Sequence, residues 1–207
     1  MELEELKTKL NIDLSRQLVT PSILLDNLRL INEDSRRSSA YVDPLYIPFY
    51  YYLGKYLSPK NVFESGTGLG LFITAFLKSC KSVENLFLFQ GKEKDFFSFR
   101  FAIKNIKSCY RKNTEMYYGD VMDKSFNEKI NEKKWDLALF NDERNYDESM
   151  YLFDFIWESL EFDGFMIIDH IESNQSINKA FFNFCKIKNK DPILFKTRYG
   201  VGILKKV

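Results

Sequence analysis

The sequence has almost no net charge. Its 30 lysine and arginine residues stand against 29 aspartate and glutamate residues, which gives a formal net charge of +1 at pH 7. A chain without an excess of either sign has no overall electrostatic attraction for nucleic acid, a membrane surface or another polyanion. Composition therefore argues against these partners, although it leaves room for a local basic patch.

Long apolar runs and a secretory signal are also lacking. No stretch approaches the roughly 18 consecutive apolar residues of a membrane-spanning helix. The first residues, MELEELKTKLNID, are acidic and amphipathic, where a signal peptide would be basic and then apolar. We therefore expect a cytoplasmic protein with no membrane partner.

Cysteine is scarce. The three cysteines, Cys80, Cys109 and Cys185, are odd in number, lie in apolar or amphipathic stretches and have no CxxC spacing. This pattern indicates buried thiols in a reducing compartment. Neither a disulfide framework nor a zinc site is indicated.

The 207 residues, of which 45% are hydrophobic, suffice for one domain with a single core. Apolar positions at helical spacing predict helices over 2–10 and 21–32, the second opened by Thr20 and Pro21. A polar loop and a short helix in FYYYLGKYL follow. We expect residues 1–60 to form an N-terminal helical extension and candidate lid, and residues 61–207 to form the main domain.

From Asn61 onward, short apolar runs alternate with helical patterns. Runs that suit strands buried on both faces lie at 62–65, 86–90, 114–118, 136–141, 164–169, 192–197 and 200–206. Helical patterns lie between them at 71–79, 94–107, 124–132, 146–160 and 174–188. The alternation predicts an α/β fold, a parallel sheet with helices on both faces. Only Arg198 and Tyr199 separate the last two runs, and so short a link forces an antiparallel hairpin.

The segment FESGTGLGLF, residues 63–72, links the first strand to a helix at the sheet edge where open α/β sheets bind ligands. Its glycines permit a tight turn and close approach of a ligand to the backbone. It lacks the GxGxxG of dinucleotide-binding loops, because Leu71 is the sixth residue from Gly66, and it lacks the Gly-Lys-Ser/Thr of a phosphate loop. Glu64 would repel a phosphate and favour an amino group or a sulfonium. A glycine-rich turn without a ligand is the alternative.

An acidic residue, GxGxG and a helix, combined with a terminal hairpin, resemble motif I and the sheet of class I S-adenosylmethionine-dependent methyltransferases. The resemblance covers roughly Asp43 to Val207, and FDGFMIIDHI and RYGVGILKK are most similar to the small-molecule O-methyltransferase branch that includes cephalosporin hydroxylase-like proteins. It implies a Rossmann-like sheet of seven mostly parallel strands, with an antiparallel last strand, and S-adenosyl-L-methionine as the cofactor. It also implies that the cofactor is bound by Glu64, Ser65, Gly66, Thr67, Gly68 and Gly70.

Further cofactor contacts follow from the same resemblance. Gln90 ends the second strand, where the family normally has an acidic residue that accepts both ribose hydroxyls. The amide loses the charge-assisted part of that bond, about 1–2 kcal/mol, and Glu93 could substitute. Asp120 matches the adenine-contacting position, with a turn or helix cap as the alternative. Asn141, after the fourth strand, completes the expected cofactor-binding set.

Candidate catalytic residues follow the fourth and fifth strands. The metal-dependent branch has an aspartate and then a histidine after the fourth strand, where this chain has Asn141, Asp142 and Arg144. A divalent cation prefers several carboxylate oxygens, so we expect no metal, with a site formed by the oxygen donors Asn141, Asp142 and Asp169 as the alternative. Asp142 and Asp169 remain catalytic candidates. His170, the only histidine, is a candidate general base, or else a polar residue that caps the strand end.

Methyl transfer from a sulfonium needs alignment, desolvation and a deprotonated acceptor, so few catalytic residues suffice. We expect a methyltransferase that acts on a small-molecule acceptor, at oxygen. A degenerate relative that keeps the fold as a binding or scaffold module is the alternative, because Gln90 and Asn141 depart from the family pattern. Nucleic-acid methylation is disfavoured by the near-neutral charge.

Seven aromatic residues precede the first strand: Tyr41, Tyr46, Phe49, Tyr50, Tyr51, Tyr52 and Tyr56. They would form a pocket wall or lid, or a helix packed on the sheet, which we favour for Phe49 and residues 52–56. Arg36 and Arg37 would meet an anionic substrate group or stay solvated. Leu24, Leu28 and Ile31 would permit a homodimer or pack on the chain's own sheet.

Overall fold

The structure is a computed structural model that describes residues 1–20, 24, 45–92 and 96–207, without the side chains of residues 96–98. Leu24 is buried, and its carbonyl accepts a hydrogen bond from Lys78 Nζ. The rest of the predicted helix over 21–32 lies outside the described residues. So do the following residues that were singled out in the sequence: Leu28, Ile31, Arg36, Arg37, Tyr41 and Glu93.

Seven strands form one sheet in the order β3-β2-β1-β4-β5-β7-β6. Strands β1 to β5 pair in parallel, whereas β7 is antiparallel to both β5 and β6. Six strands therefore run one way and β7 runs the other, as predicted. The strands are β1 Asn61–Ser65, β2 Asn85–Gly91, β3 Asn113–Gly119, β4 Trp135–Phe140, β5 Leu160–Ile168, β6 Ile193–Phe195 and β7 Val201–Lys205. The order reverses between β1 and β4, so the ligand crevice of such a sheet lies at their carboxyl ends.

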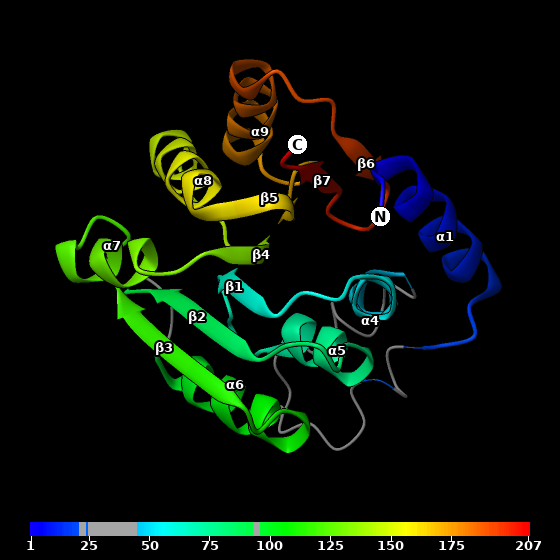
Figure 1. Ribbon diagram of the computed structural model, residues 1–207, viewed down its shortest axis with the longest axis horizontal. Helices are drawn as coiled ribbons and strands as arrows, with labels where there is room; N and C mark the ends of the chain where they lie inside the picture. The colour runs from blue at the N-terminus through cyan, green and yellow to red at the C-terminus, as the bar shows by residue number, and fades with distance from the viewer. Residues whose placement is uncertain (21–23, 25–44, 93–95) are drawn as a thin grey trace.

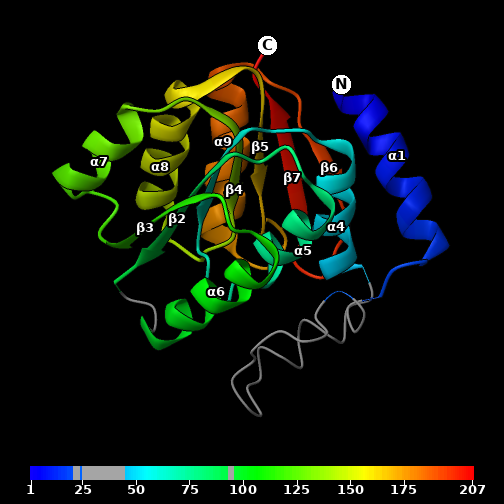
Figure 2. The ribbon, with the colours of Figure 1, turned by 60° about the horizontal axis from the view of Figure 1, so that its bottom comes forward.

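Helices cover both faces of the sheet (Figure 1). Helices α4, α5 and α6 lie on one face, α7, α8 and α9 lie on the other, and α1 lies beside α4 and β6, as the turned view in Figure 2 also shows. Their bounds are α1 Leu3–Arg16, α4 Tyr46–Tyr56, α5 Leu71–Ser79, α6 Phe96–Cys109, α7 Lys124–Asn131, α8 Tyr146–Ser159 and α9 Gln175–Lys188.

The two faces bury different side chains because successive residues of a strand point to opposite sides. Val62 contributes to the core under α4, α5 and α6, and its neighbour Phe63 contributes to the core under α7, α8 and α9. The second core is strongly aromatic: Trp135 packs against Phe63 and Phe87 with ring centroids 5.8 and 5.9 Å apart. The high phenylalanine content is therefore largely a packing feature.

Local capping fixes several helix starts. The side chain of Asn145 accepts from Glu148 N–H at 2.9 Å, and that of Asn174 accepts from Ser176 N–H at 2.9 Å. These bonds satisfy amide groups that the first turn of a helix leaves without an intrahelical partner. Helices α8 and α9 begin directly after these two asparagines, one of them a residue later than the sequence pattern indicates.

Several boundaries differ from the prediction, and helix α4 begins at Tyr46 rather than at Phe49. The first helix continues to Arg16, because Leu14 extends the apolar stripe of Leu6 and Leu10 into the core. Strand β5 begins at Leu160, before an irregularity in its pairing with β4. The link between β6 and β7 spans residues 196–200 rather than two residues, and it turns at Gly200 with φ +73°.

Two further sequence expectations concern composition. All three cysteines are free; Cys80 and Cys185 are buried and Cys109 is half-buried. None of the helices in the described part of the chain has the length and apolar character needed to cross a membrane.

A buried carboxylate joins α1 to α4. Asp13 Oδ2 accepts from Lys55 Nζ at 2.6 Å and from Tyr56 OH at 2.5 Å, and these two donors hold the pKa of Asp13 below its usual range. Asp13→Ala should therefore lower the free energy of unfolding by about 1–2 kcal/mol in urea titrations, a charged hydrogen bond discounted for the half-exposed lysine.

The matched control for this change is Glu5→Ala. Glu5 forms an exposed pair with Lys9 at 2.7 Å, and exposed pairs of this kind contribute little to stability. Because the pKa of Asp13 is lowered by folding, its contribution is present at neutral pH and is lost as the pH falls through the acidic range. Equal losses for both variants would show that α1 is not held by Asp13.

Candidate functional site

Four polar side chains share one face of the sheet at its carboxyl edge. In a strand, residues two apart point to the same side, and the residues two before them, Val62, Leu88, Leu139 and Ile167, all lie in the core under α4, α5 and α6. The strand pairing continues past the last assigned residues, since Asn141 N–H donates to Ser65 O and Asp169 N–H to Phe140 O. The four residues on this face are Glu64, Gln90, Asn141 and Asp169.

The glycine loop between β1 and α5 has three positive φ angles, at Gly66, Gly68 and Gly70. A Cβ at Gly66 would lie 2.5 Å from the Asn141 carbonyl, and one at Gly70 would lie 3.1 Å from Ala102 Cβ. These two glycines are required by the chain's own packing. A Cβ at Gly68 would meet only the Gly66 oxygen, at 3.9 Å, so Gly68 alone faces open space.

Glu64 is a buried acid without a partner. The residue is fully buried, and neither of its carboxylate oxygens has a hydrogen-bond partner. Burial raises the pKa of Glu64 to about 8, and the charge of the nearby Asp142 adds to the rise. The Thr67 hydroxyl partly opposes this rise, although its hydrogen bond goes to the Phe89 carbonyl. Leaving such a group unpaired costs about 1–3 kcal/mol or more. A bound ammonium group would remove this cost.

Gln90 fastens the loop to β2. Its side chain is 2% exposed, and Oε1 accepts from Gly68 N–H at 2.8 Å. Gly66 N–H donates to the Phe89 carbonyl at 3.0 Å. An anion-binding loop needs free amide groups that point at the ligand. Here two of those amides are used within the protein, so the loop does not suit a phosphate.

Ser65 and Asp142 lie on the opposite face, with Arg144. Asp142 Oδ2 accepts from Ser65 Oγ at 2.9 Å and pairs with Arg144 Nη2 at 2.5 Å; both charged side chains are 5% exposed. The Arg144 guanidinium also lies 5.2 Å from the centre of the Phe89 ring. Asp142 therefore carries an internal ion pair, which removes it from the face where Glu64 lies.

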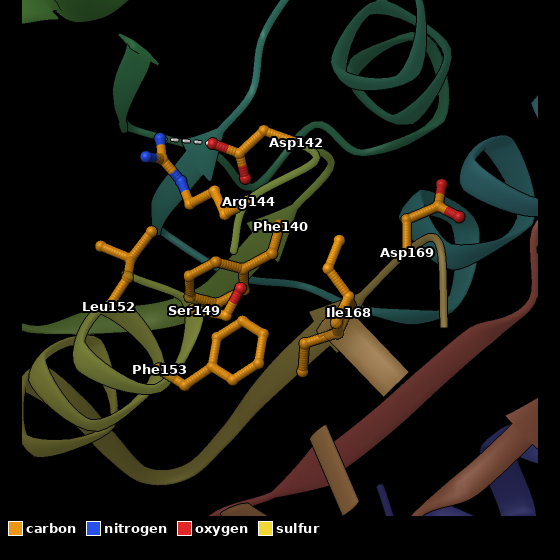
Figure 3. Close-up of a pocket in the computed structure, with 9 residues that line it drawn as sticks. Phe140, Asp142, Arg144, Ser149, Leu152, Phe153, Ile168 and Asp169 are labelled. Carbon is orange, nitrogen blue, oxygen red and sulfur yellow. Dashed lines mark ion pairs between the residues drawn. The ribbon is translucent and has the colours of Figure 1, made fainter. Parts of the chain in front are cut away.

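Figure 3 shows the small cavity beside this ion pair. Its volume is about 10 Å³, enough for about one water molecule. Phe140, Arg144, Ser149 and Ile168 contribute to its walls, and Arg144 Nε, which lacks a hydrogen-bond partner, is buried beside it. The cavity is too small for an organic ligand.

Asp169 accepts three hydrogen bonds. Oδ2 accepts from both Tyr46 OH and Tyr50 OH at 2.6 Å, and Oδ1 accepts from His170 N–H at 2.6 Å. Burial raises the pKa of Asp169 despite these bonds. Burial, and then the charge of Asp169, hold the pKa of each tyrosine well above its usual range. Helix α4 thus contributes two neutral donors to the end of β5.

His170 follows in the left-handed region, with φ +64°. Its ring stacks on Tyr199 at 4.8 Å, and Nδ1 lies 3.1 Å from Ser173 Oγ and 3.8 Å from Glu143 Oε1. When Nδ1 carries the proton and donates to Ser173, Nε2 keeps a free lone pair. A strained backbone at such an edge is typical of functional positions.

The oxygen donors that would bind a divalent cation do not converge. Asp142 is paired with Arg144 on one face, whereas Asp169 is saturated by tyrosines on the other. The described residues contain no group of three metal-binding side chains. The arrangement does not fit the metal centre of the metal-dependent branch.

Asp120 lies at the end of β3, next to Gly119. It is exposed, and its Oδ1 accepts from Met122 N–H at 2.9 Å, which is the geometry of a turn. The side chain makes the turn interaction that was the alternative for this residue. Its exposure leaves it free to contact a ligand as well.

The structure therefore brings Glu64, Gly68, Gln90 and Asn141 to one side of the loop and separates them from Ser65 and Asp142. Sequence reasoning did not find the contacts of Tyr46 and Tyr50 with Asp169. Their spacing of four residues, which places them on the same side of α4, was the available signal.

No family model and no curated protein matches the sequence. The fold is that of class I S-adenosylmethionine-dependent methyltransferases, as the solved structures similar to this chain show. A methyltransferase from Podospora anserina with bound SAH has a TM-score of 0.70 at 11% identity, covering 100% of this chain and 97% of that one. An O-methyltransferase from Bacillus cereus in complex with SAH has a TM-score of 0.59 at 13% identity, over 100% and 92%. The O-methyltransferase TomG from Streptomyces achromogenes in complex with SAM has a TM-score of 0.61 at 10% identity, over 100% of each chain.

Proposed function

We propose that this chain is a cytoplasmic S-adenosyl-L-methionine-dependent methyltransferase that acts on a hydroxyl of a small-molecule acceptor. The observation that supports it best is the buried, unpaired carboxylate of Glu64 beside an open glycine. The solved structures with this fold include methyltransferases described with SAM or SAH. In this proposal the cofactor binds at the carboxyl edge of the sheet, where these residues lie.

The residues present fit this cofactor. Glu64 would bind the ammonium group, and Gly68 would lie against the amino-acid end of the cofactor. The amide oxygen of Gln90 already accepts from Gly68 N–H, so Gln90 would donate its side-chain N–H groups to the ribose. Asn141, whose Oδ1 has no hydrogen-bond partner, adds an acceptor on the same side. The bound cofactor supplies an electrophilic methyl group on a sulfonium.

His170 is the proposed general base. Ser173 and Tyr199 orient its ring, and Nε2 takes the proton from the acceptor hydroxyl. Asp169 holds the backbone of His170 through Oδ1. In this arrangement Asp169 and Asp142 are positioning residues, the first for His170 and the second for Arg144 and Ser65.

A binding module without catalysis is the second candidate. It is favoured by Gln90, because this amide replaces the charge that would hold the ribose and already accepts from Gly68. Both candidates bind S-adenosyl-L-methionine, but only the first transfers its methyl group. Incubation with the labelled cofactor and a panel of phenols and alcohols distinguishes them.

Gly68→Asp should abolish cofactor binding while the protein stays folded. The side chain at this position would project into open space, where it would meet the carboxylate of the cofactor. Isothermal titration calorimetry should show micromolar affinity for S-adenosyl-L-methionine in the native protein and no detectable heat in the variant.

Gly68→Ala is the matched control, because it adds the same backbone strain, about 1 kcal/mol, without the charge. It should retain binding within about tenfold. If the native protein gives neither heat nor a thermal shift with millimolar S-adenosyl-L-methionine or S-adenosylhomocysteine, the proposed function is wrong.

A further inference from the structure

Charge is distributed unevenly over the molecule. Residues 141–163, which include α8, contain eight acidic residues and a single basic one, Arg144, which is buried. Residues 96–114, which include α6, contain no acidic residue. The basic residues of this second segment are Arg100, Lys104, Lys107, Arg111 and Lys112. Helices α6 and α8 lie on opposite faces of the sheet (Figure 1), but the acids of α8 are partly neutralised, because Lys188 of α9 pairs with Asp154 and Glu158.

Four of these residues form a basic stripe, which we define as Arg100, Lys104, Lys107 and Arg111. Their spacing of four, three and four residues places those within α6 on one side of the helix. All four are exposed, and none forms an ion pair within the described part of the chain. At 1.5 Å per residue, the helical part of the stripe from Arg100 to Lys107 is about 10 Å long.

Helix α7 offers a comparison, because lysines on and beside it are paired with carboxylates. Its Lys124 pairs with Glu128 at 3.5 Å, and Lys133, just beyond the helix, pairs with Glu115. On α6, no carboxylate of the described residues pairs with the basic stripe. A row of cations without paired carboxylates attracts a polyanion.

The surroundings of the stripe discriminate between polyanions. Exposed large hydrophobic side chains are absent from the described residues between 71 and 113, although an interfacial helix needs them to enter a bilayer. The same residues present no exposed aromatic ring on which an unpaired base could stack. Of the polyanions considered, the described residues therefore fit the phosphates of a duplex best, because that contact requires no base readout.

We propose that the basic stripe of α6 binds the phosphate backbone of duplex nucleic acid, without sequence preference. The inner side of the same helix supports the glycine loop: Asn105 Nδ2 donates to the Leu69 carbonyl at 3.0 Å, and Gly70 packs against Ala102. The outer side carries the basic stripe. This surface does not depend on methyl transfer, and net charge alone could not reveal it.

The test is fluorescence anisotropy of the full chain with a labelled 20-base-pair duplex over a salt series. Four phosphate contacts predict a slope of log K against log salt near −3.6. Lys104→Glu/Lys107→Glu should weaken binding at least tenfold at 100 mM salt and reduce the slope by about two. Lys124→Glu/Lys129→Glu on α7 changes the net charge equally and should alter affinity less than twofold.

Three results overturn the proposal. The first is no duplex binding by the native chain at 50 mM salt, and the second is equal weakening by the α6 and α7 variants. The third is binding to vesicles of anionic lipid, or to single-stranded nucleic acid, in preference to the duplex. Circular dichroism of each variant establishes that it is folded, and calorimetry with S-adenosyl-L-methionine tests the proposed function separately.

Discussion

Glu64→Gln should make the ligand-free protein more stable and at the same time abolish its binding of S-adenosyl-L-methionine. Both effects have one cause. Glu64 is fully buried without a hydrogen-bond partner, and its pKa is raised from 4.5 to about 8. The native fold therefore holds a carboxyl group that ionises only at high pH, and a bound cation would favour its ionised form.

The stability effect depends on pH in a defined direction. Above pH 4.5 the unfolded chain releases the proton of Glu64, whereas the folded chain retains it until about pH 8. Destabilisation therefore grows with pH between these values and is constant above them. At 1.36 kcal/mol per pKa unit it reaches roughly 3 kcal/mol at pH 7 and roughly 5 kcal/mol above pH 8. Glutamine does not ionise, so the variant should melt about 10 °C higher at pH 7, and the difference should disappear near pH 4.

The binding effect has the opposite sign. A cofactor ammonium group favours the ionised carboxylate, so binding at pH 7 should release close to one proton and affinity should rise between pH 6 and pH 8. Calorimetry in buffers of different ionisation enthalpy measures this release. Glutamine at position 64 should weaken binding at least a hundredfold and remove the proton release.

Glu84→Gln is the control, because Glu84 is exposed at the other end of the sheet, where it pairs with Lys60 at 3.7 Å. It should change neither melting temperature nor affinity. A Glu64→Gln protein that binds the cofactor as tightly as the native one would remove the main support for the proposed function, even if the gain in stability were observed.

The sheet could be predicted because its signals are local. Runs such as LFLF (86–89) and LALF (137–140) are apolar at every position, which is typical of strands buried on both faces, and GxGxG marks the turn that follows β1. The antiparallel β7 follows from the short link after β6. The true length of this link, residues 196–200, was missed, because the predicted strand included Lys196 and Thr197 whereas the pairing of β6 ends at Phe195.

The site could be predicted only in part. The alternation of side chains in strands places Glu64 and Gln90 on one face and Ser65 on the other, yet the sequence motif treats all of them as one set. Asp142 and Arg144 were assigned separately, although each is the other's partner. Tertiary pairing of charges depends on rotamers that a linear pattern does not contain.

Glycine roles illustrate the same limit. The loop was interpreted as backbone laid bare for a ligand, and at Gly68 the structure leaves such a space. Gly66 instead approaches the Asn141 backbone too closely for any side chain, and a side chain at Gly70 would have to displace Ala102. The three glycines of the motif therefore have two different roles, close packing and exposure to a ligand. Only neighbours that are distant in the sequence distinguish these roles.

Removing the hydroxyls of Tyr46 and Tyr50 on α4 is expected to cause a large loss of stability. Tyr46→Phe/Tyr50→Phe removes both donors to Asp169 Oδ2 and leaves a carboxylate that is 1% exposed with one remaining bond, from His170 N–H. Hydrogen bonds to a charged group contribute about 1.5–3 kcal/mol each, so the double variant should lose about 3–5 kcal/mol of unfolding free energy. Its loss should be smaller at pH 5 than at pH 8, because protonation of Asp169, whose pKa is raised by burial, relieves the unpaired charge.

Tyr52→Phe on the same helix separates this effect from a general sensitivity of α4. Tyr52 is 3% exposed, but its hydroxyl has no hydrogen-bond partner, and removing an unsatisfied buried polar group is neutral or stabilising. Urea titrations should therefore show a large loss for the double variant and none for Tyr52→Phe. Similar stability for both variants at pH 8 would mean that Asp169 does not depend on α4. A large loss confined to the double variant would make this helix part of the site, because it holds the carboxylate that fixes the backbone of His170.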